Sequence, residues 1–205
     1  MIREKISLTW KLMLYTLIMI ILYIEFFTEA GLGFILGLAY FTTQSNLLVA
    51  ACLFVFIVIP KQHRAKSIMR GISLVAIIIT GIVYNFVMHN VFRDWNAGGY
   101  FFTAIVTHLV VPIGYTLDWI LFDEHGHMKW KDIMWWVIYP LLYVLFSVFA
   151  GSRMGLVLYF FLDVSAGYVR LLGWLALLFF MIILVSCLIV GLDKMLRRGK
   201  GNKKC

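Results

Sequence analysis

The chain has 205 residues, of which 63% are apolar and 14% charged, with a net charge of +8 and a mean hydropathy of +0.94. Soluble domains contain about 45–50% apolar and about 25% charged residues, and a chain of this length has too much exterior to hide such an excess. The composition excludes a disordered chain, a collagen-like fibre and a secreted disulfide scaffold. It predicts an all-α membrane protein.

Six apolar stretches are each long enough for a membrane-spanning helix, which needs about 20 residues. In chain order they lie near residues 8–27, 42–59, 69–91, 100–122, 130–150 and 171–195. We therefore expect a six-helix bundle that forms one transmembrane domain over residues 1–205. The start of the second span stays open, because residues 31–59 carry no charge and contain three early glycines that allow a re-entrant or frayed beginning.

Lysine and arginine are unevenly distributed between the two sides of the predicted bundle. Fifteen of them fall on the side of the two termini and of the second and fourth connections, whereas only Arg93, Arg153 and Arg170 fall on the other. Because cytoplasmic loops carry the excess of positive charge, we expect both termini in the cytoplasm. Topology and attraction to anionic lipids account for the net charge, so membrane lipids, and no nucleic acid, are the expected partners.

Polar side chains inside the spans are concentrated in the half that we expect to face outward. They come from four helices and are Glu25, Thr42, Thr43, Gln44, Ser45, Asn46, Asn85, His89 and His108. Polar groups in hydrocarbon are costly and usually face the bundle interior. We therefore predict one cavity, lined by Thr42, Asn46, Asn85, His89 and His108.

His108 is the deepest residue of this set, about two turns from the outer end of the fourth span. Pro112 follows four residues later and has no N–H to donate to the His108 carbonyl, so we expect a kink with room for a pocket or a water. An ionisable residue at that depth favours a function, whereas threonines alone more often bond backbone carbonyls. At the other end of the span, Asp118 and Trp119 are interpreted as an interfacial anchor.

Three segments resemble a known family. They are residues 40–48 (YFTTQSNLL), residues 108–112 (HLVVP) with Asp118 and Trp119, and residues 159–164 (YFFLDV) with Gly167 and Tyr168. They are similar to bacterial six-span relatives of the androgen-induced multi-pass membrane proteins, whose eukaryotic members hydrolyse fatty acid esters of hydroxy fatty acids. The resemblance implies a threonine nucleophile at Thr42, a histidine at His108 and a bacterial cell membrane. We predict no cofactor and no bound metal.

The chemistry that the resemblance implies is consistent with the residues. A threonine hydroxyl becomes a useful nucleophile when a base removes its proton, and a neutral imidazole is the usual base near pH 7. We therefore expect the Thr42 hydroxyl within roughly 3 Å of a His108 ring nitrogen. An ester hydrolase also needs a donor for the oxyanion, and the pocket and oxyanion candidates are Gln44, Ser45, Asn46, Asn85 and His89.

Two other functions stay open. A small transporter or proton-coupled carrier would use Glu25, His89, His108 and Asp118 as relay groups, although the sequence has no inverted repeat of the kind that carriers often use. A non-catalytic lipid-binding protein would need none of these groups for chemistry. The sequence contains neither Gly-x-Ser-x-Gly nor His-Glu-x-x-His, so it does not support the serine and zinc hydrolase classes that those motifs mark.

Overall fold

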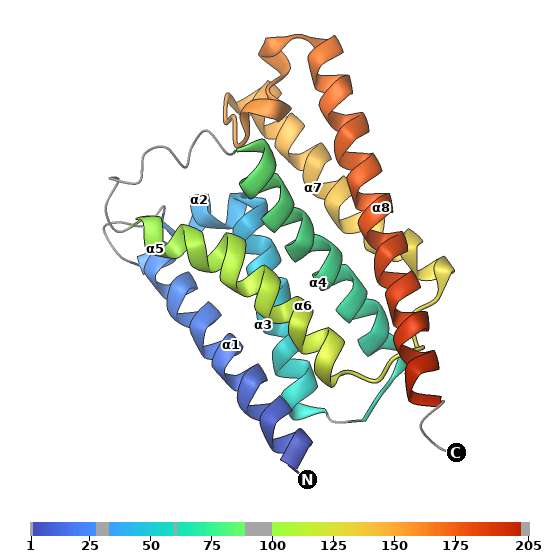
Figure 1. Ribbon diagram of the computed structural model, residues 1–205. Helices are drawn as coiled ribbons and strands as arrows, with labels where there is room; N and C mark the ends of the chain where they lie inside the picture. Colours follow the sequence, from blue (N-terminus) through green and yellow to red (C-terminus); the bar gives the residue numbers. More distant parts are fainter. Residues whose placement is uncertain (1, 28–32, 60, 89–99, 202–205) are drawn as a thin grey trace.

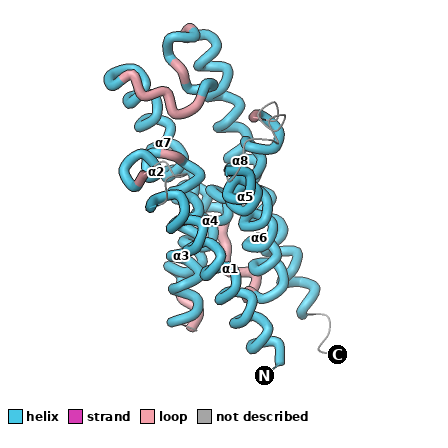
Figure 2. The backbone as a smooth tube through the Cα atoms, turned by 90° about the vertical axis from the view of Figure 1, so that its left-hand side faces the viewer, coloured by secondary structure: helices cyan, strands magenta, loops and turns pink. Residues whose placement is uncertain are grey.

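The computed structural model describes residues 2–27, 33–59, 61–88 and 100–201 (Figure 1). Helix makes up most of this backbone, and no strand is present within these ranges (Figure 2). The main helices are α1 (Ile2–Phe27), α2 (Phe34–Ala39), α3 (Phe41–Val58), α4 (Arg64–Ile82), α5 (Tyr100–Ile105), α6 (Val111–Phe122), α7 (Ile133–Met154) and α8 (Tyr168–Gly201). Shorter π and 3-10 segments are η1 (Val83–Val87), η3 (Val106–Val110), η4 (Trp130–Asp132), η5 (Phe160–Leu162) and η6 (Val164–Ala166).

Within the described ranges, six helical segments are long and apolar enough to cross a membrane. They are Ile2–Phe27, Phe41–Val58, Arg64–Val87, Phe102–Phe122, Trp130–Met154 and Tyr168–Arg197. Each overlaps one predicted span, so the prediction of an all-α protein with six membrane-spanning helices is confirmed. The start of α1 and the end of α8 lie at the same end of the bundle, and the α7–α8 connection projects at the other end (Figure 1). Which side of the membrane the termini face stays a prediction.

The third spanning segment, α4 with η1, is the centre of the bundle. Of its most apolar stretch, 61% is buried, against 28–44% for the other five segments. A close contact with α7 depends on Gly71, because a Cβ there would overlap the indole of Trp136, which is fully buried. Besides α7, α4 packs against α3, α6 and α8.

The second span begins after a separate short helix. Gly33 precedes α2 with a φ of 76°, which favours glycine, and a Cβ on Gly37 would come within 2.9 Å of the Phe26 ring. Tyr40 then adopts an extended conformation, with φ −84° and ψ 137°, between α2 and α3. The glycines therefore allow a short helix to pack on α1, and α3 makes a new start at Phe41.

The interpretation of Asp118 and Trp119 as an interfacial anchor is wrong. Asp118 is 0% and Trp119 1% exposed. The Asp118 carboxylate accepts a hydrogen bond from Lys11 Nζ at 2.8 Å and also pairs with Arg70, which donates to Asp123 at 2.7 Å. Lys11 and Arg70 lie on α1 and α4, far from Asp118 in the sequence. Counting lysines and arginines loop by loop therefore placed them at the membrane interface. Without Lys11 and Arg70, the side of the termini still carries thirteen Lys and Arg residues against three.

Candidate active site

The start of α3 has backbone N–H donors that no carbonyl of the helix itself accepts. Its first internal hydrogen bond runs from the Gln44 amide to the Tyr40 carbonyl at 3.2 Å. The amide N–H groups of Phe41, Thr42 and Thr43 therefore have no partner within α3, as is usual for the first turn of a helix. The helix dipole adds partial positive charge at the same place. Thr42 thus lies at a helix start that favours a negatively charged oxygen.

His108 lies in η3, a π-helical turn between α5 and α6. The amide of Val111 bonds the Val106 carbonyl in the π pattern, so the helix changes its hydrogen bonding just before Pro112. Pro112 has no backbone N–H to donate to the His108 carbonyl. Asn85 Nδ2 donates to that carbonyl instead, at 3.1 Å. Such π-helical turns occur frequently at functional sites. The predicted irregularity beside His108 is therefore present as a π turn supported by a side chain from η1.

The Thr42 hydroxyl and the His108 ring face each other between α3 and η3. The distance from Thr42 Oγ1 to His108 Nε2 is 3.1 Å, which agrees with the expected spacing of roughly 3 Å. The other ring nitrogen, Nδ1, lies 2.9 Å from the Ala104 carbonyl oxygen and 3.0 Å from Thr107 Oγ1. A carbonyl can only accept, so Nδ1 carries the proton and Nε2 is free to accept from Thr42. This is the tautomer that a general base for Thr42 requires.

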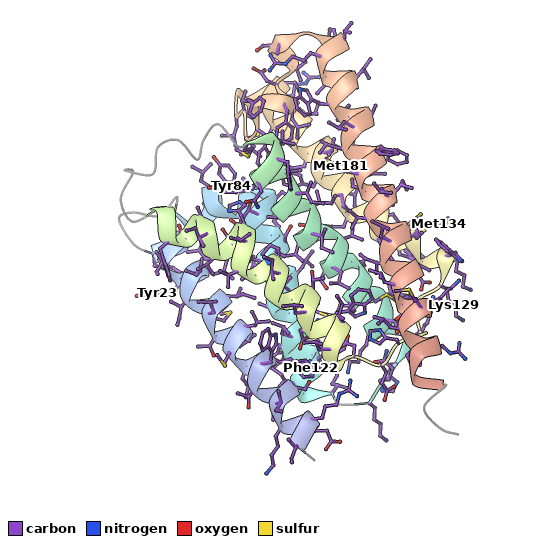
Figure 3. The ribbon with its side chains drawn as sticks, viewed as in Figure 1. Tyr23, Tyr84, Phe122, Lys129, Met134 and Met181 are labelled. Carbon is purple, nitrogen blue, oxygen red and sulfur yellow. The ribbon has the colours of Figure 1, made fainter. Side chains whose placement is uncertain are left out.

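The Tyr84 ring covers one face of the imidazole. The two ring centroids are 3.7 Å apart and the ring planes differ by 18°. Tyr84 lies in η1, which continues α4 at the end of the bundle away from the termini. Phe122, the last residue of α6, lies at the other end of the bundle (Figure 3). The stack restrains rotation of the ring, and an aromatic face attracts the cation that forms when imidazole takes a proton. Tyr84 therefore favours the orientation of the His108 ring in which Nε2 faces Thr42.

A cavity of about 250 Å³ lies beside the pair, and both Thr42 and His108 line it. All six spanning segments and the α7–α8 connection contribute to its wall. Besides the pair, the polar part of the lining consists of Glu25, Thr43, Thr80 and four tyrosines, namely Tyr40, Tyr84, Tyr143 and Tyr159. The rest is apolar, with Phe41, Ile79, Val83, Met88, Pro140, Val144, Leu158, Phe161, Leu162, Leu178 and Ile182. A mostly apolar cavity with a few converging polar groups is typical of a site for an apolar ligand.

Two tyrosines that sequence reasoning missed lie over the start of α3. The Tyr159 hydroxyl hydrogen-bonds with the Thr42 side chain and with the amides of Phe41 and Thr42. Burial raises the pKa of Tyr159 more than these hydrogen bonds lower it, so the phenol is protonated at neutral pH. Tyr143 donates to the Ala39 carbonyl at 2.9 Å. Tyr159 belongs to a segment that carries the family resemblance, whereas nothing in the sequence distinguished Tyr143.

Four predicted pocket or oxyanion residues lie outside the cavity, so the prediction that Asn46 and Asn85 line it is wrong. Their side chains satisfy backbone carbonyls. Asn46 Nδ2 donates to the Thr42 carbonyl at 2.8 Å, Gln44 Nε2 to the Leu38 carbonyl at 2.8 Å, and the Ser45 hydroxyl to the Phe41 carbonyl at 2.7 Å. Asn85 likewise donates to the Gly81 carbonyl at 2.7 Å. The fifth candidate, His89, lies outside the described residues.

The four groups that a proton-coupled carrier would use as a relay do not all lie in one site. Glu25 lines the cavity and accepts a hydrogen bond from the Thr43 hydroxyl at 3.4 Å. His108 lines the same cavity, whereas Asp118 does not and is instead held in the ion-pair network with Lys11. His89, the fourth group, falls in the part of the chain that is not described. Of this set, the structure thus brings Glu25 and His108 together and separates Asp118 from them.

Among the described residues, no group of three His, Cys, Asp or Glu side chains is arranged to hold a metal ion. No protein-family model, no curated protein and no solved structure matches the chain. The resemblance to the androgen-induced proteins therefore continues to depend on the three motifs alone.

Proposed function

We propose that this protein is an intramembrane hydrolase of lipid-like esters, with Thr42 as the nucleophile and His108 as the general base. The observation that carries the proposal is the 3.1 Å contact between Thr42 Oγ1 and His108 Nε2, with Nδ1 bound by the Ala104 carbonyl. The family resemblance independently points to the same two residues. The mostly apolar cavity beside them supports a lipid-like substrate.

In the first half of the reaction, Thr42 Oγ1 attacks the ester carbonyl carbon while its proton moves to His108 Nε2. The carbonyl π electrons move to oxygen and form a tetrahedral oxyanion. When this intermediate collapses, the bond to the alcohol oxygen breaks, and His108 returns the proton to that oxygen. The alcohol leaves, and the acyl group remains on Thr42 as an ester.

The start of α3 supports the negative charge that this step creates. The phenol oxygen of Tyr159 already lies beside the amides of Phe41 and Thr42, next to the Thr42 hydroxyl. Backbone N–H groups near a nucleophile are common donors to an oxyanion. We propose that the substrate oxygen takes this place when the Tyr159 ring moves aside, and that the phenol then donates to it as well. These groups replace the side-chain amides that the sequence suggested.

In the second half, a water molecule gives a proton to His108 Nε2 and attacks the acyl carbon. Collapse of the second oxyanion releases the carboxylic acid, and the Thr42 oxygen recovers its proton from His108. No redox partner or cofactor enters this balance. The charge distribution supports cytoplasmic termini, and the family resemblance supports a bacterial cell membrane. This orientation would open the site toward the outer half of the bilayer.

The direct test is hydrolysis of p-nitrophenyl butanoate by purified protein in lipid nanodiscs. We expect Thr42→Val and His108→Gln each to lower kcat by about 100- to 10,000-fold, and the double variant to be no worse than the poorer single variant. Thr43→Val should cost less than tenfold, because adjacent helical side chains point about 100° apart. A fluorophosphonate probe should label Thr42 in the wild type, as read by peptide mass spectrometry.

Thr116→Val is the matched control, because its hydroxyl bonds the Pro112 carbonyl within the same helix and lies outside the cavity. It should keep wild-type turnover. Full activity of Thr42→Val, in protein with an unchanged melting temperature, would exclude the nucleophile assignment. Proton or solute flux in proteoliposomes without any esterase activity would instead favour the carrier.

A further inference from the structure

We infer that the cavity accepts the acyl part of a neutral ester and limits that part to about eight carbons. The inference rests on the proposed hydrolase function and specifies its substrate class. It follows from three properties of the cavity: its volume, the side chains on its far wall, and its charge.

The volume sets the limit on length. A protein cavity of about 150 Å³ can hold benzene, which corresponds to about 25 Å³ for each carbon. On this scale the 250 Å³ beside Thr42 holds about ten non-hydrogen atoms. Two of them must be the ester oxygens, so about eight carbons remain for the acyl group. A fatty acyl chain of sixteen carbons would need about twice that space.

The far wall of the cavity is formed by α7 and α8. Thr42 and His108 belong to α3 and η3, whereas Val144 and Leu178 come from α7 and α8. Leu178 is 8% exposed and Ile182, one turn further along α8, is 2% exposed. At this wall an acyl chain therefore meets packed side chains and not open space. The size of Val144, Leu178 and Ile182 at this wall then sets the length of the acyl chain that fits.

The charge of the lining selects neutral substrates. Glu25 contributes a carboxyl group, and no lysine or arginine is among the described residues of the lining. An anionic group on the acyl chain would lose its hydration without gaining a cation as a partner, and an ionised Glu25 would repel it. An ester whose acyl chain ends in a methyl group instead meets a lining that is mostly aliphatic and aromatic.

The test is the chain-length profile of p-nitrophenyl esters from two to sixteen carbons, measured as kcat/KM in nanodiscs. Wild-type activity should peak near six to eight carbons and fall steeply beyond ten. The half-ester of adipic acid, which ends in a carboxylate, should be hydrolysed at least about tenfold more slowly than the hexanoate. Every rate is corrected for that of Thr42→Val, so that only hydrolysis at the proposed site is counted.

Leu178→Ala removes three carbons from the wall and should move the optimum toward longer chains. Each added methylene that finds apolar space is worth about fourfold, so the ratio of decanoate to octanoate rates, which differ by two methylenes, should rise about 16-fold. The ratio of dodecanoate to octanoate should rise about 60-fold, because the three carbons removed leave space for about three methylenes. Comparing ratios between variant and wild type cancels the partition of each ester into the nanodisc. Leu177→Ala is the control, because this neighbour is 43% exposed and does not line the cavity. It should leave both ratios unchanged.

The outcomes separate this inference from the proposed function. If no ester is hydrolysed faster by the wild type than by Thr42→Val, the hydrolase itself is wrong. If hydrolysis depends on Thr42 but the wild type prefers chains of twelve or more carbons, or the adipate half-ester equals the hexanoate, only the substrate class is wrong. The wild-type profile decides this even if Leu178→Ala does not fold.

Discussion

The neighbours of His108 each act on a different part of the residue. Thr42 donates to Nε2, the Ala104 carbonyl accepts from Nδ1, and the Tyr84 ring covers one face. Asn85 bonds the backbone carbonyl that Pro112 cannot serve in an α-helix. Polar groups inside a membrane must find their partners within the protein, because the hydrocarbon supplies none. In this site the same rule fixes the ring tautomer, since one ring nitrogen faces an atom that can only accept.

Asn85→Leu tests the support of the His108 backbone. The change keeps the size of the side chain but removes donors to two carbonyls, on Gly81 and His108. We expect the free energy of unfolding to fall by about 1–3 kcal/mol, because the His108 carbonyl loses its donor in a buried setting. Turnover should fall more than KM rises, since the ring shifts while the cavity remains. Urea unfolding in mild detergent and ester kinetics measure the two effects.

Thr116→Val, which loses one bond to a carbonyl of its own helix, should change stability by less than about 0.5 kcal/mol. Equal stability of Asn85→Leu and the wild type would mean that the His108 carbonyl finds another donor. The role assigned to Asn85 would then have to be abandoned.

At the scale of single elements, irregular backbone brings the two functional side chains together. The extended Tyr40 ends α2 and lets α3 make a new start beside Thr42, with first-turn amides that bond no carbonyl of the helix. The π turns η1 and η3 carry Tyr84 and His108. Glycine and proline marked two of these places in the sequence. The π turn at 83–87 has no such signal, because its sequence, VYNFV, is an ordinary apolar stretch with one asparagine.

Gly71→Ala tests the central contact between α4 and α7. The added methyl group would overlap the Trp136 indole, which is fully buried and cannot easily move aside. Overpacking of this kind costs about 1–3 kcal/mol, so the melting temperature should fall. Gly191→Ala, where the new methyl meets nothing within 4 Å, should instead keep or slightly raise it, because alanine is the better helix former. Differential scanning fluorimetry compares the two variants, and equal melting temperatures would contradict the proposed packing.

At the scale of the whole molecule, two polar centres lie in different parts of the bundle. The cavity with Thr42 and His108 lies toward α2 and the α7–α8 connection. The ion-pair network joins Lys11 on α1, Arg70 on α4, and Asp118 and Asp123 at the end of α6. Charges buried this deeply are costly unless they are paired, so the network restricts how the three helices can be arranged.

Asp118→Asn should therefore destabilise the protein strongly. It removes one of the two carboxylates that compensate Lys11 and Arg70, which are 6% and 1% exposed, and so leaves one buried positive charge without compensation. Breaking a buried pair by removing one partner costs about 3–5 kcal/mol, and we expect a loss in that range in urea unfolding. Glu124→Gln is the control, because the Glu124–His127 pair is exposed and such pairs contribute little. A loss below about 1 kcal/mol would show that the network is not needed for stability.

The predicted topology also belongs to this scale. We expect both termini in the cytoplasm, because lysine and arginine accumulate on their side even after Lys11 and Arg70 are left out. A cysteine replacing Lys61 should be blocked from an impermeant maleimide in intact cells, whereas one replacing Ser152 should react. Controls in opened cells should label both positions. The opposite labelling pattern would reverse the orientation and turn the cavity toward the cytoplasm.

The sequence alone determined the class of the protein and the number of its spans. Both depend on consecutive residues, since a helix of about 20 apolar residues matches the hydrocarbon thickness regardless of its neighbours. The sequence also marked Thr42 and His108, through a deep histidine beside a proline and a motif resemblance. It failed for Asn46 and Asn85, because helical periodicity gives the face of a polar residue but does not tell whether its donor serves a cavity or a nearby carbonyl.

Only the tertiary structure decided which distant groups become partners. Thr42 and His108 are 66 residues apart, and Lys11 and Asp118 are 107 apart. Their contacts depend on the rotation, tilt and depth of helices that the hydropathy pattern leaves free, because side-chain packing sets these and hydrogen bonds require a fit of a few tenths of an ångström. For the same reason Tyr159 became part of the site through the fold of a loop, and Asp118 changed from an expected surface anchor to the centre of a buried network.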